Sequence, residues 1–499
     1  MADALTQLKE RLTRVTDLER ISRVLTWDQQ TMMPPAGWPH RGDHLATLRR
    51  IHHETLTAPE TGRLLDELRG VEESLDPASD DGALIRLARR DYEKAVQVPT
   101  ELRAEMTRTA TEARTIWVRA RADSNFELFR PALERTYDLC RQYIDCFDEI
   151  EEPYDILLDD FEPETTTAEV SETFAELKAE LIPLIAELRD QEVDDSFLVG
   201  GTFPIDAQER LAKEVVALFG FRTDTWRLDP TEHPFASGAG VDDIRITTNY
   251  DPETMKSFFS TMHEYGHGLY SHQLPRHLER LPIGGPCSLG IHESQSRMWE
   301  NLVGRSRPFW EFFYPRAQEA FPEQLRTVEL DRFLAGINRV KPSLIRIKAD
   351  EVTYGMHVIL RFELEQDLVN GRVAIADLPE VWNERMNDYL GVDVPNDAQG
   401  VLQDTHWASG SIGYFATYLL GTMMSVQIWQ KILEDVPDLE EQIEHGSFAT
   451  LREWLGEHVH SLGRKFPPRE TLRRATGSTI DPKPYIDYLR TKYGAGVAA

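Results

Sequence analysis

The hydrophobic residues of this chain recur with helical spacing, and this periodicity limits the fold more than any other feature of the sequence. Apolar side chains three and four positions apart lie on one face of an α-helix, where they can pack against a core. The N-terminal half holds seven such stretches, which are residues 5–25, 41–56, 83–94, 100–122, 125–149, 167–190 and 205–219. Only residues 244–250 alternate apolar and polar side chains as a β-strand does. We therefore expect a predominantly helical protein.

Size and charge exclude several classes of protein. With 499 residues, 41% of them hydrophobic, the chain can bury a large core. This length allows two or three domains, but no linker divides the sequence, so we expect one catalytic domain over residues 1–499. A formal net charge of −30 argues against nucleic acids and anionic membranes as partners, because both attract basic surfaces.

The sequence also favours the cytoplasm. No uninterrupted apolar run reaches the length of about 18 residues that a membrane helix needs, and the N-terminus lacks the apolar core of a signal peptide. Three cysteines, Cys140, Cys146 and Cys287, are an odd number at spacings that suit no metal cluster. Reduced thiols are the default for such a set, and we predict a cytoplasmic protein.

The pentapeptide His263-Glu264-Tyr265-Gly266-His267 carries the strongest chemical signal. On a helix, histidines four positions apart can reach one metal ion, while Glu264 can contact a water molecule on that ion without displacing it. The apolar residues around the pentapeptide have helical spacing, and Asp251-Pro252-Glu253 has the composition of a helix start. We therefore predict a catalytic zinc site on a helix.

Two glycines inside this predicted helix indicate a close neighbour. Gly266 and Gly268 each cost about 1 kcal/mol relative to alanine in a helix interior. A helix with only a structural role has no reason to carry that cost twice. We expect another part of the molecule to approach the helix backbone at these positions.

A catalytic zinc takes a third protein ligand and keeps one position open. The metzincin class would have glycine at position 270 and histidine at 273, but Tyr270 and Gln273 stand there, so that class is excluded. A glutamate from a second helix is the remaining common arrangement, and residues 291–301 read as such a helix. We predict Glu293 as the third ligand, with His292, about 100° round the helix, supporting a ligand instead of binding the metal.

Further stretches follow in a fixed order along the chain. The C-terminal half contains Asp243-Ile244-Arg245-Ile246-Thr247, Ile345-Arg346-Ile347-Lys348-Ala349-Asp350 and Gly400-Val401-Leu402-Gln403-Asp404-Thr405-His406-Trp407. The N-terminal half contains Trp27-Asp28-Gln29, Met33-Pro34-Pro35, Tyr154-Asp155 and Leu158-Asp159-Asp160. Together with the pentapeptide and His292-Glu293-Ser294-Gln295, these stretches resemble the motifs of the thermostable-carboxypeptidase family, the carboxypeptidase Taq type of metallocarboxypeptidase. Ala416, where a proline is expected, and Asn249, where an arginine is frequent, depart from the family pattern and bear on substrate preference.

The resemblance implies a zinc-dependent enzyme that removes C-terminal amino acids from peptides. It also implies an all-α fold with a deep groove, similar to the neurolysin and angiotensin-converting-enzyme class, and a small β-sheet near the active site. Residues 1–225 would then form a helical part that covers the groove, and residues 226–499 the part that holds the zinc site. Members of the family are usually homodimers, so a homodimer is expected.

The expected reaction assigns roles to the remaining motif residues. Zinc lowers the pKa of a bound water toward about 7, and Glu264 accepts its proton as general base. His406 and Tyr414 are candidate donors to the negative oxygen that then forms, with core packing as the alternative for Tyr414. Arg346 and, after it, Arg245 are candidates to bind the terminal carboxylate, because a planar guanidinium holds both oxygens; a structural ion pair is the alternative for each.

Several alternatives stay open at this point. Cleavage inside short oligopeptides is the near alternative, because a related architecture uses the same ligands; an inactive helical scaffold is the distant one, and the intact Glu264 argues against it. Cobalt or manganese can occupy the ligands predicted for zinc. The strand at 244–250, as an edge strand, can receive an extended peptide, and Asp350 can orient a zinc histidine.

Overall fold

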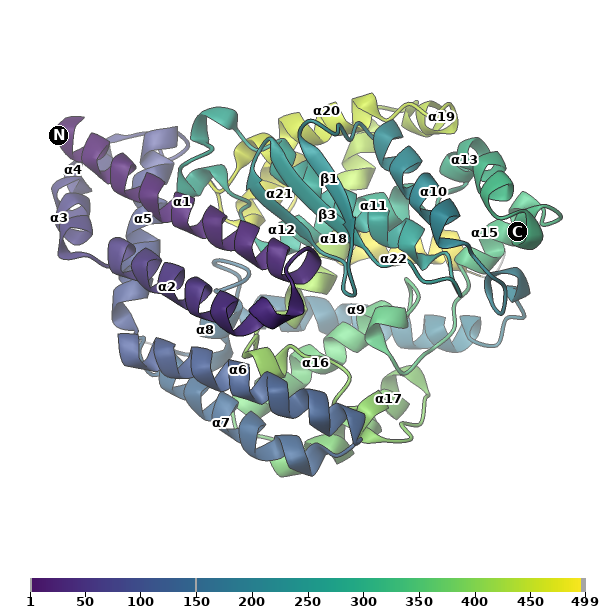
Figure 1. Ribbon diagram of the computed structural model, residues 1–499, viewed down its shortest axis with the longest axis horizontal. Coiled ribbons are helices and arrows are strands. Elements are labelled where there is room, and N and C mark those ends of the chain that lie inside the picture. The colour runs from purple at the N-terminus through teal and green to yellow at the C-terminus, as the bar shows by residue number, and fades with distance from the viewer. Residues whose placement is uncertain (1, 149, 495–499) are drawn as a thin grey trace.

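Helices make up most of the computed structural model, which describes residues 2–148 and 150–494 (Figure 1). All seven helices predicted in the N-terminal half are present, most with ends shifted by a few residues. The helices of this half are α1 Ala2–Thr31, α2 Trp38–Leu56, α3 Pro59–Glu67, α4 Arg69–Ser74, α5 Asp80–Gln97, α6 Thr100–Ala122, α7 Phe126–Ile144, α8 Pro153–Leu158, α9 Thr167–Leu188 and α10 Ile205–Leu218. Glu149, the last residue of one predicted helix, lies outside the described residues.

Polar side chains explain where several of these helices begin. The Asn125 side chain accepts a hydrogen bond from the first turn of α7, and Thr166 forms a capping box with Glu169 at the start of α9. Each cap satisfies backbone N–H groups that have no partner within the helix. Pro131 and Pro183 lie inside α7 and α9 and do not end them.

A three-stranded sheet lies beside the segment that carries the pentapeptide. Its strands are β1 Trp226–Pro230, β2 Ala236–Gly240 and β3 Asp243–Thr248, in the spatial order β1-β3-β2. β1 runs parallel to β3, and β2 runs antiparallel to it. The predicted strand is therefore present, but the expectation that it lies at an edge is wrong, because β3 pairs on both sides.

The C-terminal half is helical as well. Its helices are α11 Lys256–His272, α12 Leu289–Arg297, α13 Arg307–Ala320, α14 Pro322–Leu325, α15 Leu330–Ile337, α16 Tyr354–Val369, α17 Leu378–Leu390, α18 Phe415–Asp435, α19 Leu439–Glu444, α20 Ala449–His458, α21 Pro468–Thr476 and α22 Lys483–Tyr493. The predicted start of α11 is wrong: the Asp251 carboxylate accepts the Glu253 N–H within a turn, and the Pro252 carbonyl accepts the Phe203 N–H. These contacts hold residues 251–254 outside the helix.

The helix that contains Glu293 changes its winding after Arg297. Residues Met298–Val303 form a π-helical segment, in which the Gly304 N–H bonds to the Trp299 carbonyl five positions earlier. Such segments insert one extra residue and are frequent at functional sites. Glu300 lies in this segment.

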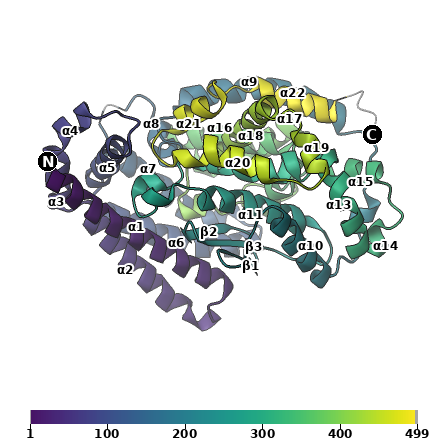
Figure 2. The ribbon, with the colours of Figure 1, turned by 90° about the horizontal axis from the view of Figure 1, so that it is seen from above.

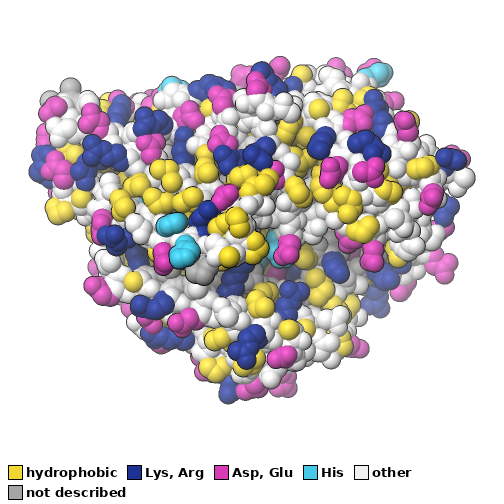
Figure 3. Space-filling view, viewed as in Figure 1, with side chains coloured by type: hydrophobic (Ala, Val, Ile, Leu, Met, Phe, Trp, Pro, Cys, Tyr) yellow, Lys and Arg dark blue, Asp and Glu magenta, His cyan; other side chains and the backbone are white. Residues whose placement is uncertain are grey.

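Two bodies of the molecule face each other across a hollow. Figure 1 places α10, α11 and the sheet on one side, with α6, α7, α16 and α17 on the other, and Figure 3 shows the hollow between them with Lys and Arg side chains in it. Figure 2 shows α1 and α2 side by side near the N-terminus. The main hydrophobic core extends from Val98 to Leu489, and a smaller one joins α1, α3 and α5 to Leu278 and Ile283. The predicted all-α fold with a small sheet near the motif helix is confirmed.

Two statements about organisation follow from the described part of the chain. None of its helices combines the length and the apolar character needed to cross a membrane. The N-terminal helices also pack into the C-terminal half: Trp117 of α6 donates to the Leu402 carbonyl, and the Asp397 carboxylate accepts the N–H of Phe126, the first residue of α7. The division at residue 225, and the expectation of one domain, stay predictions.

Candidate active site

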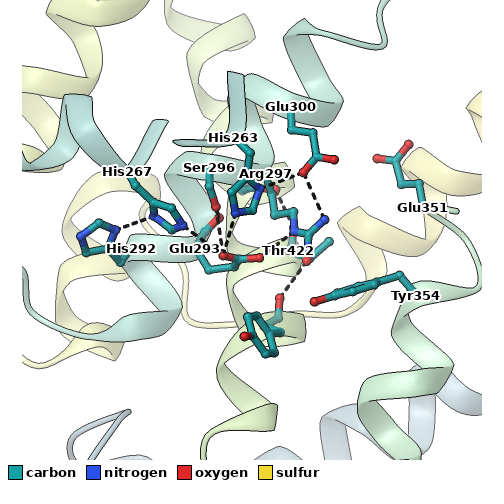
Figure 4. A network of polar contacts seen from close by, with 12 residues as sticks. His263, His267, His292, Glu293, Ser296, Arg297, Glu300, Glu351, Tyr354 and Thr422 are labelled. Atoms are coloured by element: carbon teal, nitrogen blue, oxygen red, sulfur yellow. Dashed lines mark hydrogen bonds and ion pairs between the residues drawn. The ribbon is translucent and has the colours of Figure 1, made fainter. Parts of the chain in front are cut away.

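Two helices bring the predicted metal ligands together. His263 and His267 lie one turn apart on α11, and Glu293 comes from the neighbouring α12 (Figure 4). The Nε2 atoms of His263 and His267 lie 3.7 and 3.5 Å from Glu293 Oε2. Ligand atoms of a tetrahedral ion with bonds of about 2.1 Å lie about 3.4 Å apart, so the three side chains are spaced to hold a metal ion.

Each histidine is oriented through its second ring nitrogen. His263 Nδ1 lies 2.8 Å from the Glu300 carboxylate, and His267 Nδ1 lies 2.6 Å from Nδ1 of His292. In the neutral ring, a proton on His263 Nδ1 leaves a lone pair on Nε2 that faces Glu293, and this is the tautomer that binds a metal. Burial alone would lower the pKa of His263, but Glu293 and Glu300 outweigh it and raise that pKa to about 9. The prediction that His292 supports a ligand agrees with its place beside His267.

The third ligand is fixed by its own helix. Arg297 donates to Glu293 Oε1 at 2.7 Å, and the Ser296 hydroxyl donates to Oε2 at 3.0 Å. Although burial raises the pKa of Glu293, Arg297 and the histidines bring it well below the usual range. Glu293 is therefore a charged carboxylate held in one orientation, as a metal ligand would need to be.

Glu264 differs from its neighbours in having a free oxygen. The side chain is buried, and among the described residues Oε2 accepts no hydrogen bond. Burial raises the pKa of this carboxyl group. A buried acceptor without a donor is costly unless something else occupies the site, and the attacking water of a hydrolase would satisfy it.

The two helix glycines allow the close approach that their sequence positions predict. A Cβ atom at Gly266 would lie 2.4 Å from the Gln295 carbonyl oxygen of α12, and one at Gly268 would lie 2.4 Å from the Trp226 ring of β1. Neither distance is possible for real atoms in contact. Glycine therefore lets α11 approach α12 on one side and the sheet on the other.

Arg346 lies buried in a second charged cluster. Its Nε and Nη2 both donate to Asp404 Oδ1, at 3.1 and 2.9 Å, and Nη1 donates to the Tyr354 hydroxyl at 3.2 Å. Arg361 donates through Nε to the other Asp404 oxygen at 2.6 Å. Asp404 thus serves two guanidinium groups, and three of the five N–H donors of Arg346 are occupied.

His406 and Tyr414 lie together near this cluster. Their rings are 5.4 Å apart between centroids, and His406 Nε2 lies 3.2 Å from the Tyr418 hydroxyl. Burial and the nearby arginines lower the pKa of His406 to about 4, so its ring is neutral at neutral pH. Burial raises the pKa of Tyr414 to about 12, which keeps its hydroxyl protonated. Both groups can therefore donate a hydrogen bond.

Arg245 and Asp350 occupy other positions. Asp243 binds the Arg245 guanidinium at 2.7 and 2.9 Å, and this guanidinium lies 4.4 Å from the centre of the Trp27 ring, which joins α1 to the sheet. Asp350 accepts hydrogen bonds from the backbone N–H groups of Lys341 and Thr353, so it does not orient a zinc histidine.

Sequence reasoning missed several residues that complete the site. Glu300 is the most important of them, and the sequence contained a pattern that indicates it. Glu293, Arg297 and Glu300 are spaced four and three positions apart, as charged residues that pair along one helix are. Asp404 lies within a recognised motif, two positions before His406. The ring residues Tyr354 and Tyr418 gave no signal without the fold, because they reach Arg346 and His406 from separate helices.

Comparison with known proteins agrees with this geometry. The model of the carboxypeptidase Taq (M32) metallopeptidase family matches residues 7–493. Thermostable carboxypeptidase 1 of Thermus thermophilus is 39% identical and carboxypeptidase 1 of Bacillus subtilis 36% identical; these alignments cover 96% and 97% of this chain and 96% of each relative.

Solved structures give the same result. The crystal structure of an M32 carboxypeptidase from Deinococcus radiodurans superposes with a TM-score of 0.93 at 36% identity, over 99% of both chains. Trypanosoma cruzi metallocarboxypeptidase 1 gives 0.91 at 32% identity, over 99% of this chain and 100% of that one. The chain, with its two histidines and a glutamate spaced for a metal ion, belongs to the carboxypeptidase Taq (M32) family of metallopeptidases.

Proposed function

We propose that this metallopeptidase removes single amino acids from the C-terminus of peptides, with zinc held by His263, His267 and Glu293. Two observations carry the proposal: the three candidate ligand atoms all lie within 4.8 Å of one another, and Glu264, the residue after the first of these histidines, has a buried oxygen with no hydrogen-bond partner among the described residues. When bound, the metal ion would lower the pKa of a water molecule and polarise the scissile carbonyl. Cobalt or manganese is the alternative ion for the same ligands.

Glu264 would move the proton in this reaction. Its free oxygen accepts a proton from the attacking water as the new C–O bond forms, and the same carboxyl group then delivers it to the leaving amine. The raised pKa of Glu264, which burial causes, suits a group that must hold a proton between these two steps.

His406 and Tyr414 would stabilise the negative oxygen that develops on the carbonyl. A neutral imidazole and a protonated phenol are both N–H or O–H donors, and both remain in that form at neutral pH. Removing one such donor costs about 10²–10³ in turnover in other hydrolases. His406 is the stronger candidate of the two, because packing in the core remains an alternative role for Tyr414.

Arg346 would bind the terminal carboxylate of the substrate. Three of its N–H groups are occupied by Asp404 and Tyr354, which leaves one N–H on each Nη atom. These two groups form the end of the guanidinium fork and can hold both oxygens of a carboxylate. Arg245 is the weaker candidate, because Asp243 and Trp27 already engage it.

Free-acid and C-terminally amidated forms of one peptide test the proposal. The free acid should be shortened one residue at a time, as mass spectrometry of the products will show, and the amide should be cleaved at least about 100-fold more slowly because the guanidinium loses its charged partner. Arg346→Ala should narrow this difference by slowing the free acid far more than the amide. Equal cleavage of both forms, with internal fragments, would support the oligopeptide endopeptidase instead.

Three broader expectations remain predictions. The resemblance to the family favours a homodimer, and the sequence favours the cytoplasm and argues against nucleic acid and membrane partners. Light scattering on the purified protein will give its oligomeric state. Purified protein that hydrolyses no peptide in the presence of zinc, so that a chelator has no activity to remove, would favour the inactive scaffold.

A further inference from the structure

The segment that follows α8 contacts both sides of the site. Its sequence motif, Leu158-Asp159-Asp160, was recognised as part of the family pattern but has no role in the reaction proposed above. The next two residues, Phe161 and Glu162, reach towards different parts of the site: Glu162 binds α12, and Phe161 contacts Tyr414. This inference rests on the proposed function, since it concerns the metal ligand and the oxyanion donor named there.

Glu162 binds the first turn of the helix that carries Glu293. The carboxyl group is buried, with 1% of the residue exposed, and accepts the Ser288 hydroxyl at 3.0 Å and the Gly290 N–H at 2.9 Å. Between them, the Leu289 N–H bonds to the Phe161 carbonyl at 3.1 Å. Three consecutive residues at the start of α12 are therefore bound by two residues of this segment.

A glycine makes the contact possible. A Cβ atom at position 290 would lie 2.7 Å from a Glu162 oxygen, so a larger residue there would push the carboxyl group away from its present place at the helix start. Glu293 follows Gly290 by three residues, less than one helical turn. A shift of this first turn therefore moves the metal ligand directly.

Phe161 and its neighbours hold the opposite side. The Phe161 ring packs edge-on against the Tyr414 ring, with centroids 5.2 Å apart. Glu365 binds the chain just before Tyr414: it accepts the Gly413 N–H at 3.0 Å and the Tyr154 hydroxyl of α8 at 2.6 Å. Phe161 therefore contacts Tyr414 directly, and α8, just before it in the chain, holds the residue before Tyr414 through Glu365.

The segment is itself firmly attached. Asp159 binds Arg90 at 2.7 Å, and Asp160 accepts the Tyr143 hydroxyl at 3.0 Å and binds Lys94 at 2.6 Å. These contacts connect it to α5 and α7, so it can act as a fixed reference for the two sides of the site.

We propose that Phe161 and Glu162 are positioning residues that fix the metal-ligand helix α12 relative to Tyr414. Glu162 determines where Glu293 presents its ligand oxygen, and Phe161 determines where Tyr414 presents its hydroxyl. A simple role in helix capping predicts a loss of stability alone. The positioning role predicts that metal binding and turnover change separately when the two residues are changed separately.

Two substitutions of nearly equal size test Glu162. Glu162→Gln keeps an oxygen for the Gly290 N–H and can donate to Ser288, and since burial raises the pKa of Glu162 to about 7, an amide resembles its neutral form. Glu162→Met fills the same space without hydrogen bonds. We expect E162M to bind zinc at least about tenfold more weakly, measured by competition with a chromogenic chelator, and E162Q to stay within about threefold of the wild type.

Asp155 provides the matched control. It lies in the same part of the chain and accepts the N–H of Thr167 at the start of α9, a helix that carries none of the site residues. Asp155→Leu removes this helix-start bond and should leave zinc affinity within about twofold of the wild type. Zinc binding of E162M equal to that of E162Q, or an equal loss in D155L, would overturn the proposal. If E162M does not fold, Glu162→Ala replaces it in the comparison.

Phe161→Leu tests the other side. We expect kcat to fall at least about tenfold, with zinc affinity and KM near their wild-type values, because Tyr414 is displaced while the metal ligands stay in place. Unchanged kcat in F161L, or a parallel loss of zinc, would contradict the division of roles. Zinc affinity is measured without substrate, so a failure of the carboxypeptidase assignment in the peptide assay is recognised separately.

Discussion

The metal-ligand region and the arginine region of the site differ in the sign of their uncompensated charge. When both histidines are in the neutral form that binds a metal, the carboxylates of Glu264, Glu293 and Glu300 outnumber the guanidinium groups of the metal-ligand region. Arg297 lies 2.7 Å from Glu293 and 3.3 Å from Glu300, and Arg305 lies 3.9 Å from Glu300. Burial makes this excess of negative charge strong, because little water screens it. A divalent cation is the partner that it suits.

The arginine region has the opposite balance. Arg346 and Arg361 share the single carboxylate of Asp404, and burial together with the charge of Arg346 lowers the pKa of Arg361 to about 10. The uncompensated positive charge suits an anionic group. Two regions of opposite sign in one site therefore suit a substrate whose reactive carbonyl lies close to its own negative end, as in a peptide cleaved at its last bond.

The largest expected effect concerns the free oxygen in the metal-ligand region. Glu264→Gln should lower turnover by about 10²–10⁴, because the proton acceptor is lost, while zinc content after dialysis should match the wild type, because all three ligands remain. Rate assays and atomic absorption on the same preparation will measure both. Near wild-type turnover would show that another group accepts the proton.

In the arginine region, Asp404→Asn should lower the free energy of unfolding at pH 7 by about 3–5 kcal/mol, since it leaves two buried guanidinium groups without their anion. Burial alone would raise the pKa of Asp404, but the two arginines hold it well below its usual range. Its contribution is therefore present above the unfolded pKa of about 3.9 and is lost as the pH falls below it.

Urea unfolding of wild type and Asp404→Asn at pH 7 and near pH 3.5 will test this sign. The stability difference between the two proteins should be constant from pH 7 to 5 and narrow towards acid. A stability difference that is the same at pH 7 and near pH 3.5, or that widens in acid, would mean that the ion pairs of Asp404 do not stabilise this region.

The smallest effect concerns the partner of His263. Glu300→Gln can still accept the imidazole N–H but removes a negative charge, so zinc affinity should fall by about 10–100-fold with the same ligands in place. Competition with a chelator at fixed pH will measure it, with Glu311→Gln, a partly exposed glutamate of α13, as the control. Unchanged affinity would mean that the charge of Glu300 does not support the metal.

Local patterns in the sequence were enough to predict the metal ligands and most N-terminal helices. The spacing of His263 and His267 is a property of one helix, so periodicity alone places the two rings together. Gly266 and Gly268 likewise indicated close approach, although not that α12 and β1 are the neighbours. Glu293 could be predicted as the third ligand because residues 291–301 read as a second helix and supply a glutamate.

The remaining features depend on contacts between distant segments. β2 consists of Ala236–Gly240, whose residues have low strand propensity, and it forms because β3 offers a partner. The side chain of Arg346 could be predicted as functional, but its pairing with Asp404 could not, because the two residues are 58 positions apart in the chain. The false start of α11 at Asp251 has the same cause, since the Pro252 carbonyl bonds to Phe203 in a distant loop.

The π-helical segment Met298–Val303 makes the site sensitive to the number of residues as well as to their identity. Glu293 lies before this segment and Glu300 inside it, and both reach His263. Deleting one residue there would restore α-helical winding, so the helix beyond Val303 would keep its place while the side chains inside the segment, that of Glu300 among them, would point in new directions. An engineered variant that lacks one residue of this segment would keep all three predicted metal ligands and still move Glu300 away from His263.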